Sequence, residues 1–586
     1  MIIKFTNNEE ISRPAVNILI SCITGIITFN LIQKNIYGAV LVAASFFLLH
    51  FIIYGKRFMV VICIFFIASY INCLIYYSLN SEYKTVFKVV AVNPKSKIVE
   101  IGRQSFKIEG INTDLKDGSK YLIYGSFGHE PDIEKGLVGT IKVEKYSFLE
   151  YGFSGSVNSK QDDFYNILKK YIGEEGSALV CSAAFGYTKY IKNEQNVLMS
   201  KYGIIHVVSV SGFHIAVIYS IIEKLLGFKF ALVFSFIYTL FSGGKSSTWR
   251  AFLMIFILKL SKKVYRKYDS ISALSFSAIL LMVYKPYFIY DIGFNLSYLS
   301  TLGILLFYNK LKIRFYKLPQ ILSDTFCISI AAQIFSFPVA TLALNNFSPN
   351  FMWGNLFLLP LFTPIVILGN IAFMLMWNEV LLKITAYIIK IFIVALQGGI
   401  SVVDKFSLNI TTINPSIVYG YVLLLICFYM YQNGYKKAKN ILWMVVLAVI
   451  LSMYKFETKV TIITDGKTNG ILMEQGFRRV LITKTLSGYS YNILNKNYYP
   501  IESIEWKNKK MYSYNGITII PKDEDKEIAI VSSKNSYILT INNQPYVCNQ
   551  SYDIIKIDEN KSFILDQKDT KALNDNILDS EGDNSD

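Results

Sequence analysis

The sequence predicts a polytopic α-helical membrane protein of about 13 spans, some of them broken or re-entrant, with two β-rich modules outside the membrane. Hydrophobic residues make up 53% of the chain, and the mean hydropathy is +0.37. Apolar runs of about 20 residues, the length that crosses a bilayer, recur along the sequence. Lys and Arg gather in alternate short turns between these runs, which is typical of cytoplasmic loops.

Residues 1–80 are expected to form the N-terminal transmembrane helices. Their apolar runs are Pro14–Leu31, Ile36–Tyr54 and Phe58–Leu79. Lys56 and Arg57 mark the turn after the second run as cytoplasmic, so the N-terminus is expected inside the cell and the next module outside it. The first residues include Glu9 and Glu10 and no basic leader, so no cleaved signal peptide is expected.

Residues 81–150 are expected to form an extracytoplasmic β-barrel. Apolar and polar residues alternate in five short segments, which read VFKVVAV, KIVEIG, SFKIEGI, KYLIYGSF and TIKVEKY. Five strands in so short a stretch are typical of an OB-fold, and such barrels often bind single-stranded nucleic acid through stacked aromatic rings. A structural module is the favoured interpretation, because the pattern shows no row of aromatic residues on one face.

Residues 151–190 are expected to hold amphipathic surface helices. Gln161–Gly173 has apolar residues at helical spacing, acidic residues in its first turn and lysines in its last. This helix is expected to lie on the outer membrane surface or on the core itself. A more apolar helix is expected at Ser177–Phe185.

Residues 191–454 are expected to form the membrane core, with Gly203–Leu226 as its central segment. This segment contains five residues that are costly at membrane depth unless they face other helices or a water-filled path, namely His206, Ser209, Ser211, Gly212 and His214. The two histidines share one face if the helix is continuous, and they are expected to contact phosphates or bases, or to cap a broken helix. For Ser211 and Gly212 the alternative is close packing or a helix break.

Basic turns orient the rest of the core. Each inward crossing ends in lysines, and the last run, Ile441–Tyr454, leaves the C-terminal region outside. Ala231–Phe241 and Trp249–Leu260 are too short to cross upright, so broken or re-entrant helices are expected there. The formal charge of +17 fits a polyanionic partner, or merely the basic bias of cytoplasmic loops.

Arg250 stands at the head of the second short run. A guanidinium there needs carboxylate, carbonyl or phosphate partners because it stays charged. Asp291 is the expected structural polar partner, and an ion pair that only fixes two helices is the alternative to a functional role. The surrounding SGGKSSTWRAF is not a phosphate-binding loop, because Thr239 stands where that motif needs its first glycine.

Six blocks follow one another between Ser177 and Tyr431. They read ALVCSAAFGYTKYI, IIHVVSVSGFHIAVIY, SSTWRAFLM, YKPYFIYDIGFNLSYLSTLGI, AAQIFSFPVA and FMWGNLFLLPLFTP. In this order they resemble the ComEC competence family, and the barrel in front resembles that family's N-terminal module. The resemblance implies a channel that takes DNA as a single strand across the bacterial cytoplasmic membrane during natural transformation. Its proposed DNA path consists of His206, Ser209, Ser211, Gly212, His214 and Arg250.

The same resemblance implies partners but no cofactor. The expected partners are single-stranded DNA, membrane lipid, a cytoplasmic helicase or translocase motor, an extracellular DNA receptor and a separate nuclease. The nuclease is expected to be separate because the C-terminal region departs from the family pattern.

Residues 455–568 are expected to be a degenerate metallo-β-lactamase-like domain that is β-rich, and residues 569–586 an acidic disordered tail. Family members often end in a domain whose HxHxDH motif holds a catalytic metal. Here Val460–Leu472 reads VTIITDGKTNGIL, and no histidine follows His214. Asp465 alone cannot hold a metal, so no hydrolase chemistry is expected.

Two other classes of function are weighed against the channel. A secondary transporter of a small solute also uses broken helices and buried polar residues, although no internal repeat is visible. An intramembrane hydrolase that uses Ser211 and His214 is disfavoured, because two residues three apart on one helix lack an orienting carboxylate.

The basic turns generate a topological prediction. Reporters inserted near Asn93 and fused after Tyr454 are both expected on the extracytoplasmic side. Alkaline phosphatase activity and green fluorescent protein fluorescence of paired fusions measure the side directly. A cytoplasmic signal from either position would overturn the orientation.

Overall fold

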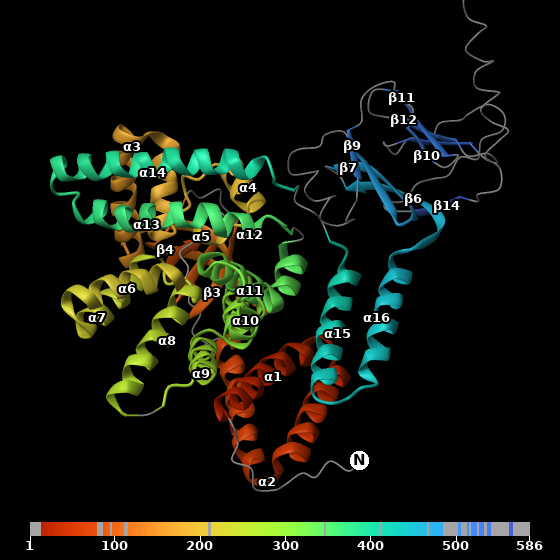
Figure 1. The fold of residues 1–586 in the computed structure, drawn as a ribbon, viewed down its shortest axis with the longest axis horizontal. Coiled ribbons are helices and arrows are strands. Elements are labelled where there is room, and N and C mark those ends of the chain that lie inside the picture. Colours follow the sequence, from red (N-terminus) through yellow and green to blue (C-terminus); the bar gives the residue numbers. More distant parts are fainter. Residues whose placement is uncertain are drawn as a thin grey trace, which may run out of the picture. The chain divides into compact units, whose positions relative to one another are not determined.

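The chain divides into two compact units, Met1–Val339 with Ser348–Asn409 and Ala340–Phe347 with Ile410–Asp586. Figure 1 labels most of their helices and many of their strands. The computed structural model describes residues 13–78, 86–93, 97–110, 115–208, 212–265, 267–344, 347–408, 413–465, 468–483, 502–505, 512–514, 517–523, 527–531, 536–540 and 562–565.

The N-terminal helices α1 (Pro14–Lys34) and α2 (Ile36–Tyr77) cover the three apolar runs expected there. α2 is 42 residues long and contains two of those runs. Asn35 begins α2, and its side chain accepts hydrogen bonds from two backbone N–H groups of the first turn. The two helices approach closely at Gly25, where a Cβ atom would lie 2.7 Å from the carbonyl oxygen of Phe66.

Five strands follow α2 and close into a barrel. They are β1 (Val86–Asn93), β2 (Ile98–Ile101), β3 (Gln104–Glu109), β4 (Ser119–Gly128) and β5 (Leu137–Tyr151). Their order is β1-β2-β3-β5-β4, with β3 and β5 parallel and the other neighbours antiparallel. Val89, Val99, Phe106 and Ile141 are fully buried inside it. The strands expected from the period-two pattern are therefore confirmed.

The barrel is held to the helical core at the end of α2 and at the short helix η2 (Pro286–Tyr290). Tyr76 donates a hydrogen bond to the carbonyl oxygen of Gly136 at 3.3 Å. Gly136 has a φ of 70°, and any Cβ there would collide with the ring of Tyr287. Lys285, only 7% exposed, pairs with Glu100 of β2 at 2.5 Å. These contacts connect the barrel to the core at several points.

α3 (Phe153–Phe185) contains both of the helices expected between the barrel and the core. Gly173 interrupts it with a φ of 77°, which is the break that the sequence places between the two. Phe164 is fully buried, and its ring contacts those of Phe185 at 5.8 Å and Phe373 at 5.4 Å. The amphipathic half of α3 therefore packs on the core itself, one of the two positions expected for it.

The remaining elements of the first unit are helices joined by short turns. They are α4 (Asn193–Lys201), α5 (Ile205–Val208), α6 (Gly212–Leu226), α7 (Phe228–Phe241), α8 (Ser246–Lys263), α9 (Ser270–Tyr284), α10 (Ile292–Arg314), α11 (Gln320–Leu344), α12 (Phe351–Trp353), the π-helix η3 (Gly354–Leu358), α13 (Leu359–Met374) and α14 (Glu379–Asp404). α13 and α14 run side by side (Figure 1).

The two short apolar runs of the core become helices of different length. α7 has 14 residues, and at about 1.5 Å per residue it is too short to cross about 30 Å of hydrocarbon. α8 has 18 residues, because it begins and ends beyond the apolar run that predicted it. Among the described residues, six stretches are long and apolar enough to cross a membrane. They are Pro14–Lys34, Ile36–Tyr54, Phe58–Tyr77, Gln320–Leu344, Phe351–Met374 and Pro415–Gln432.

The second unit contains the end of α11 and two further helices, α15 (Pro415–Gln432) and α16 (Ala438–Met453). The strands that follow are β6 (Lys455–Asp465), β7 (Thr468–Gly476), β8 (Arg478–Thr483), β9 (Glu502–Glu505), β10 (Tyr512–Tyr514), β11 (Ile517–Asp523), β12 (Glu527–Val531), β13 (Ser536–Thr540) and β14 (Ser562–Leu565). They form two sheets, ordered β10-β11-β12-β13 and β14-β6-β7-β8-β9. The expected β-rich character of this region is confirmed, and the acidic tail lies outside the described residues.

The packing of α10 on α11 generates a prediction. A Cβ atom at Gly303 of α10 would collide with the carbonyl oxygen of Ala331 of α11. Gly303→Ala is therefore expected to destabilise the protein by about 1–3 kcal/mol through overpacking. Gly398→Ala in α14 is the matched control, because nothing lies within 4 Å of its Cβ position and alanine favours a helix by about 1 kcal/mol. Thermal unfolding of the detergent-solubilised chain should separate the two variants, and equal midpoints would contradict this packing.

Candidate functional site

The central segment starts at a rigid corner between α4 and α5. Gly203 has a φ of 69°, and a Cβ atom there would lie 2.6 Å from the Cα of Phe351. Just before it, Lys201 pairs with Asp404 at 2.5 Å, and the hydroxyl of Tyr202 donates to the same carboxylate at 2.8 Å. These bonds, together with one from Ser407, lower the pKa of Asp404 to about 2. The corner is therefore fixed to the end of α14.

Asn350 also holds the corner between α4 and α5 in place. Its side chain is 1% exposed and donates to the carbonyl oxygens of Lys201 at 2.9 Å and Leu408 at 2.7 Å. It also accepts a hydrogen bond from the N–H of Leu408 at 2.8 Å. The π-helix η3 follows, and Gly354 at its start leaves no room for a Cβ against the carbonyl oxygen of Tyr202. π-helical turns often occur at functional sites.

The residues predicted on the central segment have different surroundings. His206 is exposed on α5, and its Nδ1 lies 3.1 Å from the carbonyl oxygen of Gly203. His214 is fully buried on α6. The two imidazoles therefore do not share one environment. Ser209 and Ser211 lie outside the described residues.

Arg250 is the predicted site residue that the structure brings against the central segment. A Cβ atom at Gly212, the first residue of α6, would lie 2.6 Å from Nη2 of Arg250. Nε donates to the hydroxyl of Ser297 at 2.8 Å, and Nη1 donates to the hydroxyl of Thr301. The guanidinium is partly buried, and among the described residues no carboxylate pairs with it. It links α6, α8 and α10 through neutral groups.

The expected ion pair between Arg250 and Asp291 is wrong. Asp291 stands at the N-cap of α10, where its carboxylate accepts from the N–H of Phe294 at 2.6 Å and the hydroxyl of Ser246 at 3.2 Å. The acidic group is therefore engaged by a helix terminus, which favours negative charge. Asp291 does connect α10 with α8, but through Ser246 rather than through the guanidinium.

Ser297 and Thr301 are site residues that the sequence reasoning missed. They are four residues apart in α10, so both lie on the same helix face and reach one guanidinium. Their spacing could have indicated them, because a guanidinium that donates through two nitrogens needs two acceptors on the same helix face.

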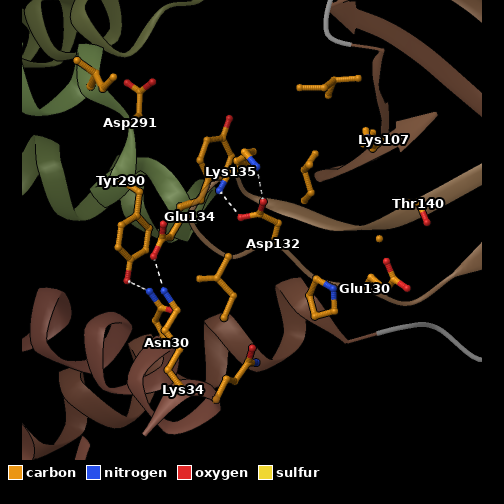
Figure 2. Close-up of a pocket in the computed structure, with 18 of the residues that line it drawn as sticks. Asn30, Lys34, Lys107, Glu130, Asp132, Glu134, Lys135, Thr140, Tyr290 and Asp291 are labelled. Carbon is orange, nitrogen blue, oxygen red and sulfur yellow. Dashed lines mark hydrogen bonds and ion pairs between the residues drawn. The ribbon is translucent and has the colours of Figure 1, made fainter. Parts of the chain in front are cut away.

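A cavity of about 1060 Å³ lies between the barrel, the end of α1 and the start of α10. Figure 2 shows its charged lining, where Lys34 pairs with Glu134 and Lys135 pairs with Asp132. Lys107 pairs with Glu109. Each lysine of this lining is thus neutralised, and the remaining charged groups, Glu130 and Asp291, are acidic. The cavity is therefore ill suited to phosphates.

The barrel carries an aromatic cluster that the sequence pattern did not reveal. The ring of Tyr121 contacts those of Tyr146 at 6.2 Å and Phe148 at 5.7 Å, and Phe148 contacts Tyr151 at 5.2 Å. Lys116 lies over the ring of Tyr151 at 5.8 Å. Tyr146, Phe148 and Tyr151 are each more than 40% exposed. Rings with a neighbouring cation are the type of surface on which bases stack.

The apolar helices define a helical membrane protein, in which hydroxyl groups hold a partly buried guanidinium. Residues 184–434 match the family described as Competence protein. This match covers the central segment, Arg250 and Asp291, and it confirms the resemblance to the ComEC competence family over this part of the chain.

Curated relatives each match part of the chain. Over 271 residues the chain is 22% identical to ComE operon protein 3 of Bacillus subtilis, which covers 45% of this chain and 34% of that protein. Over 109 residues it is 33% identical to an uncharacterized protein of Aquifex aeolicus, covering 18% and 26%. An uncharacterized protein of Mycoplasma genitalium is 31% identical over 147 residues, covering 23% and 37%. The chain thus spans little more than a third of these relatives at most. No solved structure matches it.

The corrected role of Asp291 generates a prediction. Asp291→Ala is expected to cost about 0.5–2 kcal/mol, the usual effect of losing a helix cap, whereas Asp291→Asn keeps the accepting oxygen and should remain close to wild type. If the carboxylate were instead the counter-ion of Arg250, asparagine would cost about 3–5 kcal/mol. Thermal unfolding of both variants in detergent therefore distinguishes a cap from an ion pair.

Proposed function

We propose that this chain is a channel for the uptake of single-stranded DNA across the bacterial cytoplasmic membrane during natural transformation. The competence-family match over residues 184–434 supports the role. The observation that carries the proposal is Arg250, a cation held by two hydroxyls beside Gly212. In this proposal the chain is a channel rather than an enzyme, and its partners are a separate motor, a DNA receptor and a nuclease.

The charge of Arg250 supports an anionic cargo for a physical reason. Moving a cation out of water costs several kcal/mol even after relaxation, and a structural arginine usually recovers that cost from a carboxylate. The two hydroxyls hold the guanidinium in place but supply no negative charge, and none of the described carboxylates pairs with it. A phosphate that passes Gly212 would supply the missing negative charge. One cation among neutral donors also lets the phosphate leave again, which conduction requires.

The remaining parts of the proposal concern architecture. The strand order β1-β2-β3-β5-β4 with parallel β3 and β5 supports an OB-like barrel. About 13 spans, a cytoplasmic N-terminus and an extracytoplasmic barrel and C-terminal domain follow from the basic turns. His206, Gly212 and His214, together with Ser209 and Ser211, are proposed to border the path that Arg250 serves.

Substitution of Arg250 tests the function. Arg250→Ala is expected to lower internalisation of labelled DNA by about 10-fold or more, because a hydrogen bond to a charged group contributes about 1.5–3 kcal/mol. Arg250→Lys keeps the charge but loses the fork, so an intermediate loss is expected. The measurement is nuclease-protected DNA in a deletion strain complemented with each variant, with folded protein quantified after extraction from the same membranes.

Arg13→Ala is the matched control. Arg13 pairs with Asp269 at 3.3 Å on the surface, and such exposed pairs contribute about 0–1 kcal/mol. Uptake and abundance should both stay at the wild-type level in this control. If abundance falls in step with uptake in Arg250→Ala, the residue only packs helices, and if uptake is unchanged, the proposed path is refuted. A solute transporter would predict no DNA uptake from the wild-type chain.

A further inference from the structure

Lys245 is a second cation near the head of α8, in the turn between α7 and α8. Two glycines with positive φ precede it, Gly243 at 83° and Gly244 at 58°. Its carbonyl oxygen accepts hydrogen bonds from the N–H groups of Thr248 at 3.0 Å and Trp249 at 3.1 Å. The backbone of Lys245 is therefore fixed, and with it the position from which the side chain extends.

The ammonium group of Lys245 is not neutralised by a carboxylate in the part of the chain that the structure describes. Its Nζ donates to the carbonyl oxygen of Gly186 at 3.3 Å, at the C-terminal end of α3. The side chain is partly buried, and burial lowers its pKa. By contrast, the nearby Lys189 and Lys192 pair with Asp162 at 2.9 Å and Glu175 at 3.1 Å.

The carboxylate bound by the residue after Lys245 is already engaged. Ser246, the next residue, donates to Asp291, whose carboxylate also caps α10. Lys245 and Arg250 thus share one property, because both are partly buried and both are held by neutral oxygens. They are five positions apart in the sequence, which corresponds to about 7.5 Å along a helix.

We propose that Lys245 contacts phosphate groups of the same single strand that passes Arg250, as a second anion-contact point near the head of α8. This inference rests on the proposed function and adds a residue outside the path predicted from the sequence. An ammonium is a compact point charge, which contacts a phosphate without the geometric demand of a guanidinium. Two single contacts on successive phosphates allow a strand to advance while one contact is kept.

The competing account is that Lys245 only caps the C-terminal end of α3, where a cation is favoured. Glutamine separates the two roles, because its amide can still donate to the carbonyl oxygen of Gly186 but carries no charge. Lys245→Gln is therefore the test variant, and Lys245→Arg is the variant that keeps the charge. Lys192→Gln is the matched control, since it removes one exposed charge from the same region.

The experiment measures binding of a fluorescent oligothymidine by the detergent-solubilised chain at a series of salt concentrations. For single strands, each neutralised phosphate contributes about −0.7 to the slope of log K against log salt concentration. Lys245→Gln should flatten the slope by about 0.7, with an unchanged thermal unfolding midpoint, whereas Lys245→Arg and Lys192→Gln should keep the wild-type slope.

The outcomes are distinguishable. A wild-type slope in Lys245→Gln overturns the inference while leaving the proposed function intact, and so does an equal flattening in Lys192→Gln. A lowered unfolding midpoint with an unchanged slope identifies Lys245 as a helix cap and also overturns it. If the wild-type protein binds no oligothymidine and its gene does not restore uptake, the proposed function fails together with this inference.

Discussion

The first unit depends on how the charge of Arg250 is accommodated. Its guanidinium reaches Gly212 at the start of α6 and donates to Ser297 and Thr301 of α10, while its backbone belongs to α8. Three helices therefore meet around one cation. A Cβ atom at position 212 would lie 2.6 Å from Nη2, so a larger residue there would require the guanidinium to shift away from its position between α6 and α10.

Much of the fold could be predicted from the sequence, because each element has its own local periodicity. Alternation with period two located the barrel strands, and apolar runs located α1, α2, α11 and α13. The break at Gly173 was visible for the same reason, since glycine there separates an amphipathic from an apolar stretch. Arg250 could also be singled out, because a guanidinium in an apolar context is conspicuous.

The contacts of the site could not be predicted, because they depend on register and on distant partners. A carboxylate was expected for Arg250, yet the carboxylate of Asp291 is more useful at an N-cap, where it satisfies the N–H of Phe294. Likewise, the aromatic cluster of the barrel depends on irregular pairing between β4 and β5 near Lys120 and Tyr121. Such an irregularity shifts which side chains share a face, and a strict period-two pattern does not show it.

Net charge is a weaker guide to function here than the pairing of individual charges. The formal charge of +17 sums all charged groups of the chain, whereas each lysine that lines the cavity between the barrel and α1 is paired with a carboxylate. Arg250 and Lys245 differ from them because neutral oxygens hold both side chains. A path for a polyanion needs few such groups, since a row of uncompensated cations would retain the strand instead of releasing it. Two cations near the start of one helix, set among hydroxyls and carbonyls, meet that requirement better than a basic groove would.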